Sequence, residues 1–161
     1  MYTQAALIDV YTRAQRALVK LLNHCRGLSA EELVRPLDGF GDPTVREQLW
    51  HVISAEEYWV GVILGKMLVE ENGDRYPDIA ALEAYREKVA AATASYLQSA
   101  SDAELSGRRE MTTWGGNVNA LVPAHILVRI TTHIFQHQGQ VLAMCRLMGK
   151  PGPGRTDFPL D

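Results

Sequence analysis

The chain has 161 residues, of which 47% are hydrophobic and 22% are charged, the balance of an ordinary globular domain. The net charge is −3 and Arg108–Arg109 is the only adjacent basic pair. This argues against nucleic acid as the main partner, because duplex binding requires many phosphates to be neutralised. A polar start and the absence of a long apolar run argue against a signal peptide and a membrane span, so we expect a cytoplasmic protein.

The first predicted element is a helix over residues 3–26, which Gly27 ends. Its apolar residues recur every three or four positions and therefore share one face: Leu7, Val10, Ala14, Ala17, Leu18, Leu21 and Cys25. A capping box over Ser29–Glu32 predicts a further short turn of helix. Cys25 and the distant Cys145 form no Cys-x-x-Cys pair, and we expect both to be free, buried thiols.

A second helix is predicted over residues 44–68, starting at the capping box Thr44–Glu47. Its apolar stripe comprises Val45, Leu49, Val52, Trp59 and Ile63. Glu56 and Glu57 are interpreted as part of a solvated face, since paired acids on helices are usually exposed, with a general base as the alternative. Asn72, Gly73 and Pro77 mark the connection that follows.

A third helix is predicted over residues 78–100, followed by a short turn at Ser101–Glu104. Residues 107–119 are the least regular part of the chain and fit either a loop or a small hairpin. Trp114, within this region, is a candidate for the mouth of a pocket, with a core or interface position as the alternative.

The fourth helix is predicted over residues 123–148, with Pro123 in its first turn and Gly149 at its C-cap. The tail from Lys150 to Asp161 is rich in Pro and Gly, and must lie on the surface or across the bundle. Four amphipathic helices of roughly 25 residues predict an all-α four-helix bundle, a single domain over residues 1–161.

Two histidines interrupt the apolar stripe of the fourth helix, and they point to a metal. His133 and His137 are four residues apart, so they project from one face and two imidazoles can converge on one ion. A shared cation uses one nitrogen of each buried ring and favours its neutral form. The same spacing also occurs on ordinary solvated faces, which is the alternative.

His51, on the second helix, borders the core face and is the candidate third ligand. Its alternative is a half-buried histidine bonded to a backbone carbonyl. His125 is rotated by roughly 80° from His133 at 100° per residue, and should not reach the same ion. His24 ends the first helix, where a histidine is unremarkable.

The chain resembles the DinB/YfiT-like superfamily of four-helix bundles over essentially its whole length. The resemblance rests on residues 49–59, residues 133–140 and the tail from Gly149 to Phe158. It implies an up-down-down-up helix order and a metal triad that by position is His51, His133 and His137, holding Ni or Zn with water. Where family members usually carry Arg this chain has Gln138, which removes a charge beside the implied site.

The resemblance implies metal-dependent hydrolases and bacillithiol or mycothiol S-transferases and isomerases. Three protein ligands leave a coordination position for water or a thiolate, as in catalytic sites. We therefore expect an enzyme acting on a small molecule, with S-transfer involving a low-molecular-weight thiol slightly favoured, because a soft thiolate suits an open site. The alternatives are a non-catalytic metal-containing stress or binding protein, and a metal-free bundle whose dimer surface is its function. A homodimer through exposed apolar helix faces is a further expectation.

Overall fold

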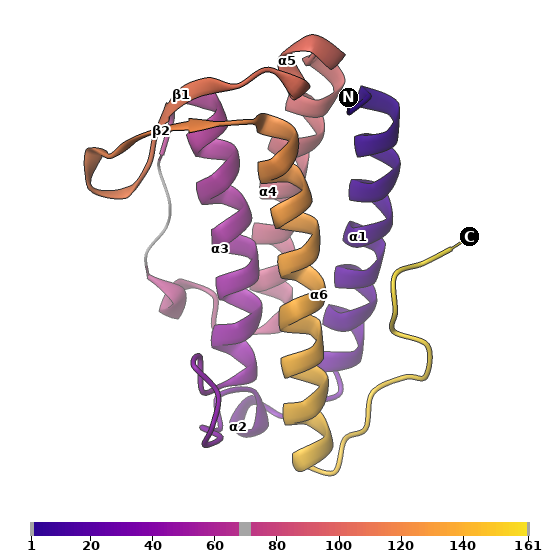
Figure 1. Ribbon diagram of the computed structural model, residues 1–161. Coiled ribbons are helices and arrows are strands. Elements are labelled where there is room, and N and C mark those ends of the chain that lie inside the picture. The colour runs from indigo at the N-terminus through magenta and orange to yellow at the C-terminus, as the bar shows by residue number, and fades with distance from the viewer. Residues whose placement is uncertain (1, 68–71, 161) are drawn as a thin grey trace.

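The computed structural model describes residues 2–67 and 72–160, and four long helices dominate it (Figure 1). The long helices are α1 (Gln4–Cys25), α3 (Val45–Leu64), α4 (Ile79–Ser99) and α6 (Pro123–Leu147). The short elements are α2 (Ala30–Leu33), η1 (Gly73–Arg75), α5 (Asp102–Ser106), β1 (Arg109–Thr112), η2 (Trp114–Gly116) and β2 (Val118–Leu121). The prediction of an all-α bundle is confirmed. None of the described helices is long and apolar enough to cross a membrane.

The four long helices form a ring in which α1 and α3 each pack against both α4 and α6. Gln4, at the start of α1, donates its backbone N–H to Asp102 beside the end of α4. At the other end of the bundle, Lys150 after α6 pairs with Glu32 in α2. Accordingly, α1 and α6 run in one direction and α3 and α4 in the other (Figure 1).

Side-chain caps fix where most helices begin. Both predicted capping boxes are present, at Ser29–Glu32 and Thr44–Glu47, and each satisfies backbone N–H groups that a helix start leaves free. The expected end of the second helix at Leu68 lies outside the described residues, and α3 ends earlier, at Leu64. Gly65 takes a left-handed conformation (φ 66°) that glycine adopts without steric cost, and this ends the helix.

The core consists of two clusters of buried apolar side chains, one in each half of the bundle. The half near α2 includes Leu22, Leu49 and Met144, and the half near the hairpin includes Leu97 and Leu127. Cys25 and Cys145 lie in the first cluster as free, buried thiols, so that prediction is confirmed. A hydrogen bond to Cys145, together with burial, raises the pKa of the Cys25 thiol, which disfavours reactivity there.

Residues 109–121 form a small antiparallel hairpin, the second of the two predicted alternatives. Arg109 pairs with Leu121 and Thr112 with Val118. Gly115 and Gly116 at its tip have φ values of 68° and 75°, which bulkier residues rarely adopt. The hairpin lies across the end of α3 and the start of α6 and projects sideways past α3 (Figure 1), so it overhangs one face of the bundle.

Candidate metal centre

Three imidazoles meet between α3 and α6, the two helices that pack most closely on each other. His51 comes from α3, and His133 and His137 come from successive turns of α6. One ring nitrogen of each lies within 4.8 Å of the others. The ring centroid of His51 lies 5.2 Å from that of His133 and 4.8 Å from that of His137. The structure therefore brings together all three histidines singled out in the sequence.

Gln48, one turn before His51, fixes the orientation of His137. Its amide nitrogen donates to the carbonyl of Asp42 at 2.8 Å and to Oε1 of Gln140 at 3.1 Å, so its own Oε1 faces His137. That oxygen lies 2.5 Å from Nδ1 of His137 and accepts its proton. Nε2 of His137 consequently presents a lone pair, and it lies 3.0 Å from Nε2 of His133.

The surroundings of His133 and His137 favour the neutral form of both rings. Burial, followed by His137, His51 and the Arg129 cation, lowers the pKa of His133 from its usual 6.5 to about 4. Burial and then His51 also lower the pKa of His137, against a weaker opposing effect of Asp42. Because only the neutral ring donates a lone pair to a metal, this environment prepares both groups as ligands near pH 7.

The donor set fits a divalent transition metal. Zinc–nitrogen distances of about 2.0–2.1 Å in a tetrahedral site imply nitrogens roughly 3.3 Å apart. The 3.0 Å between the two Nε2 atoms on α6 is close to that value. Three imidazole ligands without a carboxylate or thiolate suit Zn, Ni, Cu or Fe(II) rather than Mg or Ca. In the described part of the chain, no other cluster of His, Cys, Asp and Glu has this geometry.

A cavity of about 780 Å³ opens above His51 and His133. Its walls are largely aromatic and carry few charges: Trp50, Tyr58, Trp59, Trp114, Thr113, Asn117, Asn119 and Arg129 belong to the lining. The Trp114 ring stacks on Tyr58 at 4.9 Å and 8°, and the Trp114 backbone N–H donates to the Tyr58 hydroxyl at 2.9 Å. Trp114, 58% exposed, therefore stands at the mouth, as the sequence led us to expect.

Among the described residues, Arg129 is the one Arg or Lys in the lining of this cavity. Its guanidinium lies 5.2 Å from the ring centre of Trp59, within the range of a cation–π contact. Arg129 is exposed, yet it borders the cavity that leads to the histidines.

The interpretation of Glu56 as solvated is wrong, since the side chain is 2% exposed. It accepts hydrogen bonds from Tyr11 at 2.6 Å, Thr93 at 2.7 Å and Gln15 at 2.8 Å. Burial raises its pKa, against the effect of these bonds. It lines neither large cavity, so a general-base role at the histidines has no support. Glu57 is partly buried and accepts from Tyr85 at 2.5 Å and from Lys88 at 3.2 Å.

The other residues weighed in the sequence lie elsewhere. His125 makes an edge-on contact with Tyr2 at 5.6 Å, and His24 lines a second cavity, so neither joins the triad. Gln138, expected beside the histidines, lines that second cavity instead and bonds to the carbonyl of Thr156 in the C-terminal tail. The presence of Gln138, where family members usually carry Arg, therefore changes the surface that faces the tail.

The model of the DinB family matches residues 1–161 of the chain. The chain belongs to the DinB family. No curated protein matches it. Among solved structures, this DinB-family chain is similar to a crystal structure titled as the conserved protein of locus from Enterococcus faecalis, with a TM-score of 0.66 and 15% identity. The likeness covers 87% of this chain and 95% of the other, and it shows the shared fold alone.

Proposed function

We propose that this protein is a metal-dependent enzyme, with His51, His133 and His137 holding one Zn or Ni ion and a small molecule as substrate. The observation that carries the proposal is the convergence of three imidazole nitrogens within 4.8 Å of one another, two of them on His51 and His133, which line a 780 Å³ cavity. This volume lies within the usual range for small-molecule sites.

The chemistry of such a site follows from its three protein ligands. When bound, a divalent ion there supplies Lewis-acid chemistry at an open position, for water in hydrolysis or for a thiol in S-transfer. S-transfer is favoured, because none of the described residues that line the cavity carries a carboxylate, and a soft thiolate suits a nitrogen-ligated metal of this type.

The residues around the cavity have separate tasks in this proposal. Gln48 holds the lone pair of His137 toward the site, through its 2.5 Å bond to Nδ1. Trp59 and Trp114 provide an apolar wall that displaces water from a bound substrate. Arg129, exposed at the rim, attracts an anionic group of the substrate.

The test is turnover by metal-loaded protein. Zn- and Ni-reconstituted samples are assayed for transfer of low-molecular-weight thiols to electrophiles, and for hydrolysis of ester and amide substrates. His133→Ala should abolish either activity, whereas His125→Ala, an exposed histidine on the same helix, should leave it unchanged. A parent protein that binds metal but turns over no substrate would overturn the enzyme proposal and leave a non-catalytic binding protein.

A further inference from the structure

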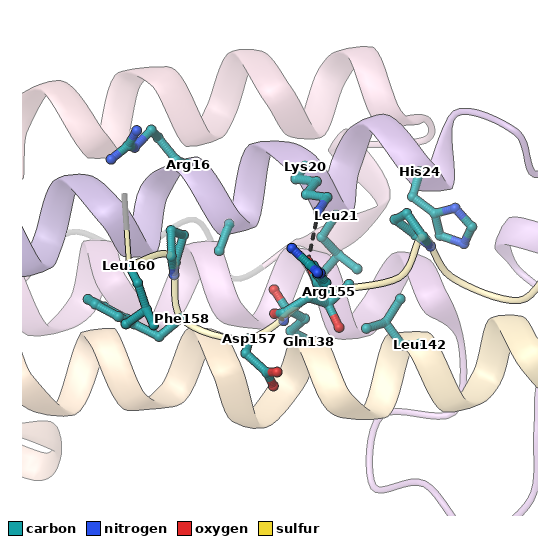
Figure 2. Close-up of a pocket in the computed structure, with 14 residues that line it drawn as sticks. Arg16, Lys20, Leu21, His24, Gln138, Leu142, Arg155, Asp157, Phe158 and Leu160 are labelled. Atoms are coloured by element: carbon teal, nitrogen blue, oxygen red, sulfur yellow. Dashed lines mark hydrogen bonds between the residues drawn. The ribbon is translucent and has the colours of Figure 1, made fainter.

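A second cavity, of about 770 Å³, lies between α1, α6 and the C-terminal tail (Figure 2). Within the described part of the chain, it shares no lining residue with the cavity above the histidines. The two are therefore separate, and whatever the second cavity holds need not approach the metal centre.

Side chains of α1 and α6 hold the tail in place by its backbone. Lys20 Nζ donates to the carbonyl of Arg155 at 2.8 Å, and Arg13 Nη1 donates to the carbonyl of Pro159 at 3.2 Å. Gln138 on α6 donates to the carbonyl of Thr156. These bonds leave the side chains of the tail available to line the space beneath it.

The lining of this cavity is apolar in one part and positively charged in another. Leu21 and Leu142 come from α1 and α6, and Phe158 comes from the tail, where its ring lies 5.7 Å from that of Phe135. The charged side chains of the lining are Arg16, Lys20, Arg155 and Asp157. Three cations against one carboxylate reverse the balance of the whole chain, whose net charge is −3.

Two further observations point to a ligand that carries polar groups, and the first of them favours a negative one. The Asp157 carboxylate is directed away from Lys20, so it does not neutralise that side of the cavity (Figure 2). Nε2 of His24, at one end of the lining, is buried and has no hydrogen-bond partner within the described residues. A buried ring nitrogen without a partner is unfavourable, and a polar ligand atom would satisfy it.

We propose that this cavity binds a small amphipathic carboxylate, such as a medium-chain fatty acid. The carboxylate lies near Lys20 and Arg155, where it gains charge-assisted hydrogen bonds. The hydrocarbon chain packs on Leu21 and Leu142, which lie together on one side of Lys20 and Arg155 (Figure 2), and is removed from water. The volume of the cavity is in the range that small ligands occupy.

Decanoate is the probe for this site, measured by isothermal titration calorimetry with the full chain. The parent should bind one equivalent, and Lys20→Met should weaken binding about tenfold, as expected for the loss of one charged hydrogen bond. Arg13→Met is the matched control, because Arg13 also holds the tail but does not line the cavity. It should change affinity by less than about threefold, corresponding to an indirect effect.

Decyltrimethylammonium, which has the same chain length and the opposite charge, should bind at least about tenfold more weakly than decanoate. In NMR spectra, decanoate should shift the backbone amides of residues 155–158. The variant His133→Ala should bind decanoate like the parent, whatever the outcome for the metal. The proposal is overturned if decanoate does not bind saturably, if the two variants of α1 weaken binding equally, or if the shifts cluster around His133 instead.

Discussion

Nδ1 of His137 lies 2.5 Å from Oε1 of Gln48, and this contact decides which nitrogen of the histidine faces His51 and His133. Gln48 is fully buried, and its amide nitrogen has two acceptors of its own, so its orientation is fixed from both sides. A glutamine on α3 thus prepares a histidine on α6 to accept a metal.

Gln48→Leu should lower metal affinity by about 10- to 100-fold while all three histidines remain, because His137 loses the acceptor that fixes its tautomer. Competition with a chromophoric chelator measures the change. Gln136→Leu, an exposed position one residue before His137, is the control and should bind metal like the parent. Equal metal affinities for the parent and the Gln48 variant would show that Gln48 does not prepare His137 as a ligand.

Glu56→Gln should lower the free energy of unfolding by about 1–3 kcal/mol, because an amide nitrogen then replaces one oxygen that accepts from buried donors. Gln15 cannot simply turn its amide around, since its Oε1 accepts from Arg86 at 3.3 Å. Urea unfolding gives the change. Glu57→Gln, its partly exposed neighbour, should cost less than about 1 kcal/mol. Equal free energies of unfolding for the parent and the Glu56 variant would contradict a stabilising role for the hydrogen bonds to Glu56.

The metal-free protein should lose stability as the pH falls from 6.5 to about 4, owing to His133. In that window the unfolded chain takes up a proton at this residue and the folded chain does not, so stability rises with pH. Urea titrations with excess chelator, compared between the parent and His133→Asn, isolate this contribution. The raised pKa of Glu56 acts in the opposite sense in both proteins and cancels in the comparison. If the free energies of unfolding of the two proteins changed with pH in parallel, the lowered pKa of His133 would be refuted.

Tyr58→Phe should loosen the hairpin, because the Trp114 N–H loses its acceptor while the stacked rings remain. The expected cost is about 0.5–1.5 kcal/mol. Hydrogen–deuterium exchange of residues 113–117 should become faster. Tyr85→Phe removes a hydroxyl that bonds to Glu57, away from the hairpin, and should leave that exchange unchanged. Unaltered exchange in the Tyr58 variant would contradict the anchoring role.

The long helices and the histidine cluster could be predicted from the sequence, because both follow from local rules. Periodicity identifies α1 and α4, and the capping residue Thr44 marks the start of α3 within one residue. The i, i+4 spacing places His133 and His137 on one face. The sequence places His51 at the border of a core face, but its assignment to the triad depended on family resemblance, since nothing local tells which helix faces α6.

The role of Glu56 was missed, although its spacing carried the signal. It follows Leu49 and Val52 at seven and four residues, and so belongs to their buried stripe, but residue type was given more weight than position. The side chains that donate hydrogen bonds to the Glu56 carboxylate come from α1 and α4, and the sequence alone cannot place these helices beside it. Gln138 was misplaced for a related reason, because the tail that it contacts has no periodic pattern of its own.

The most direct test is the metal content of untagged protein, measured by mass spectrometry beside His51→Ala, His133→Ala and the control His125→Ala. We expect about one equivalent of Zn or Ni in the parent and the control, and almost none in the two triad variants. A parent that holds no metal even after reconstitution with Zn and Ni, or triad variants that retain a full equivalent, would contradict this expectation.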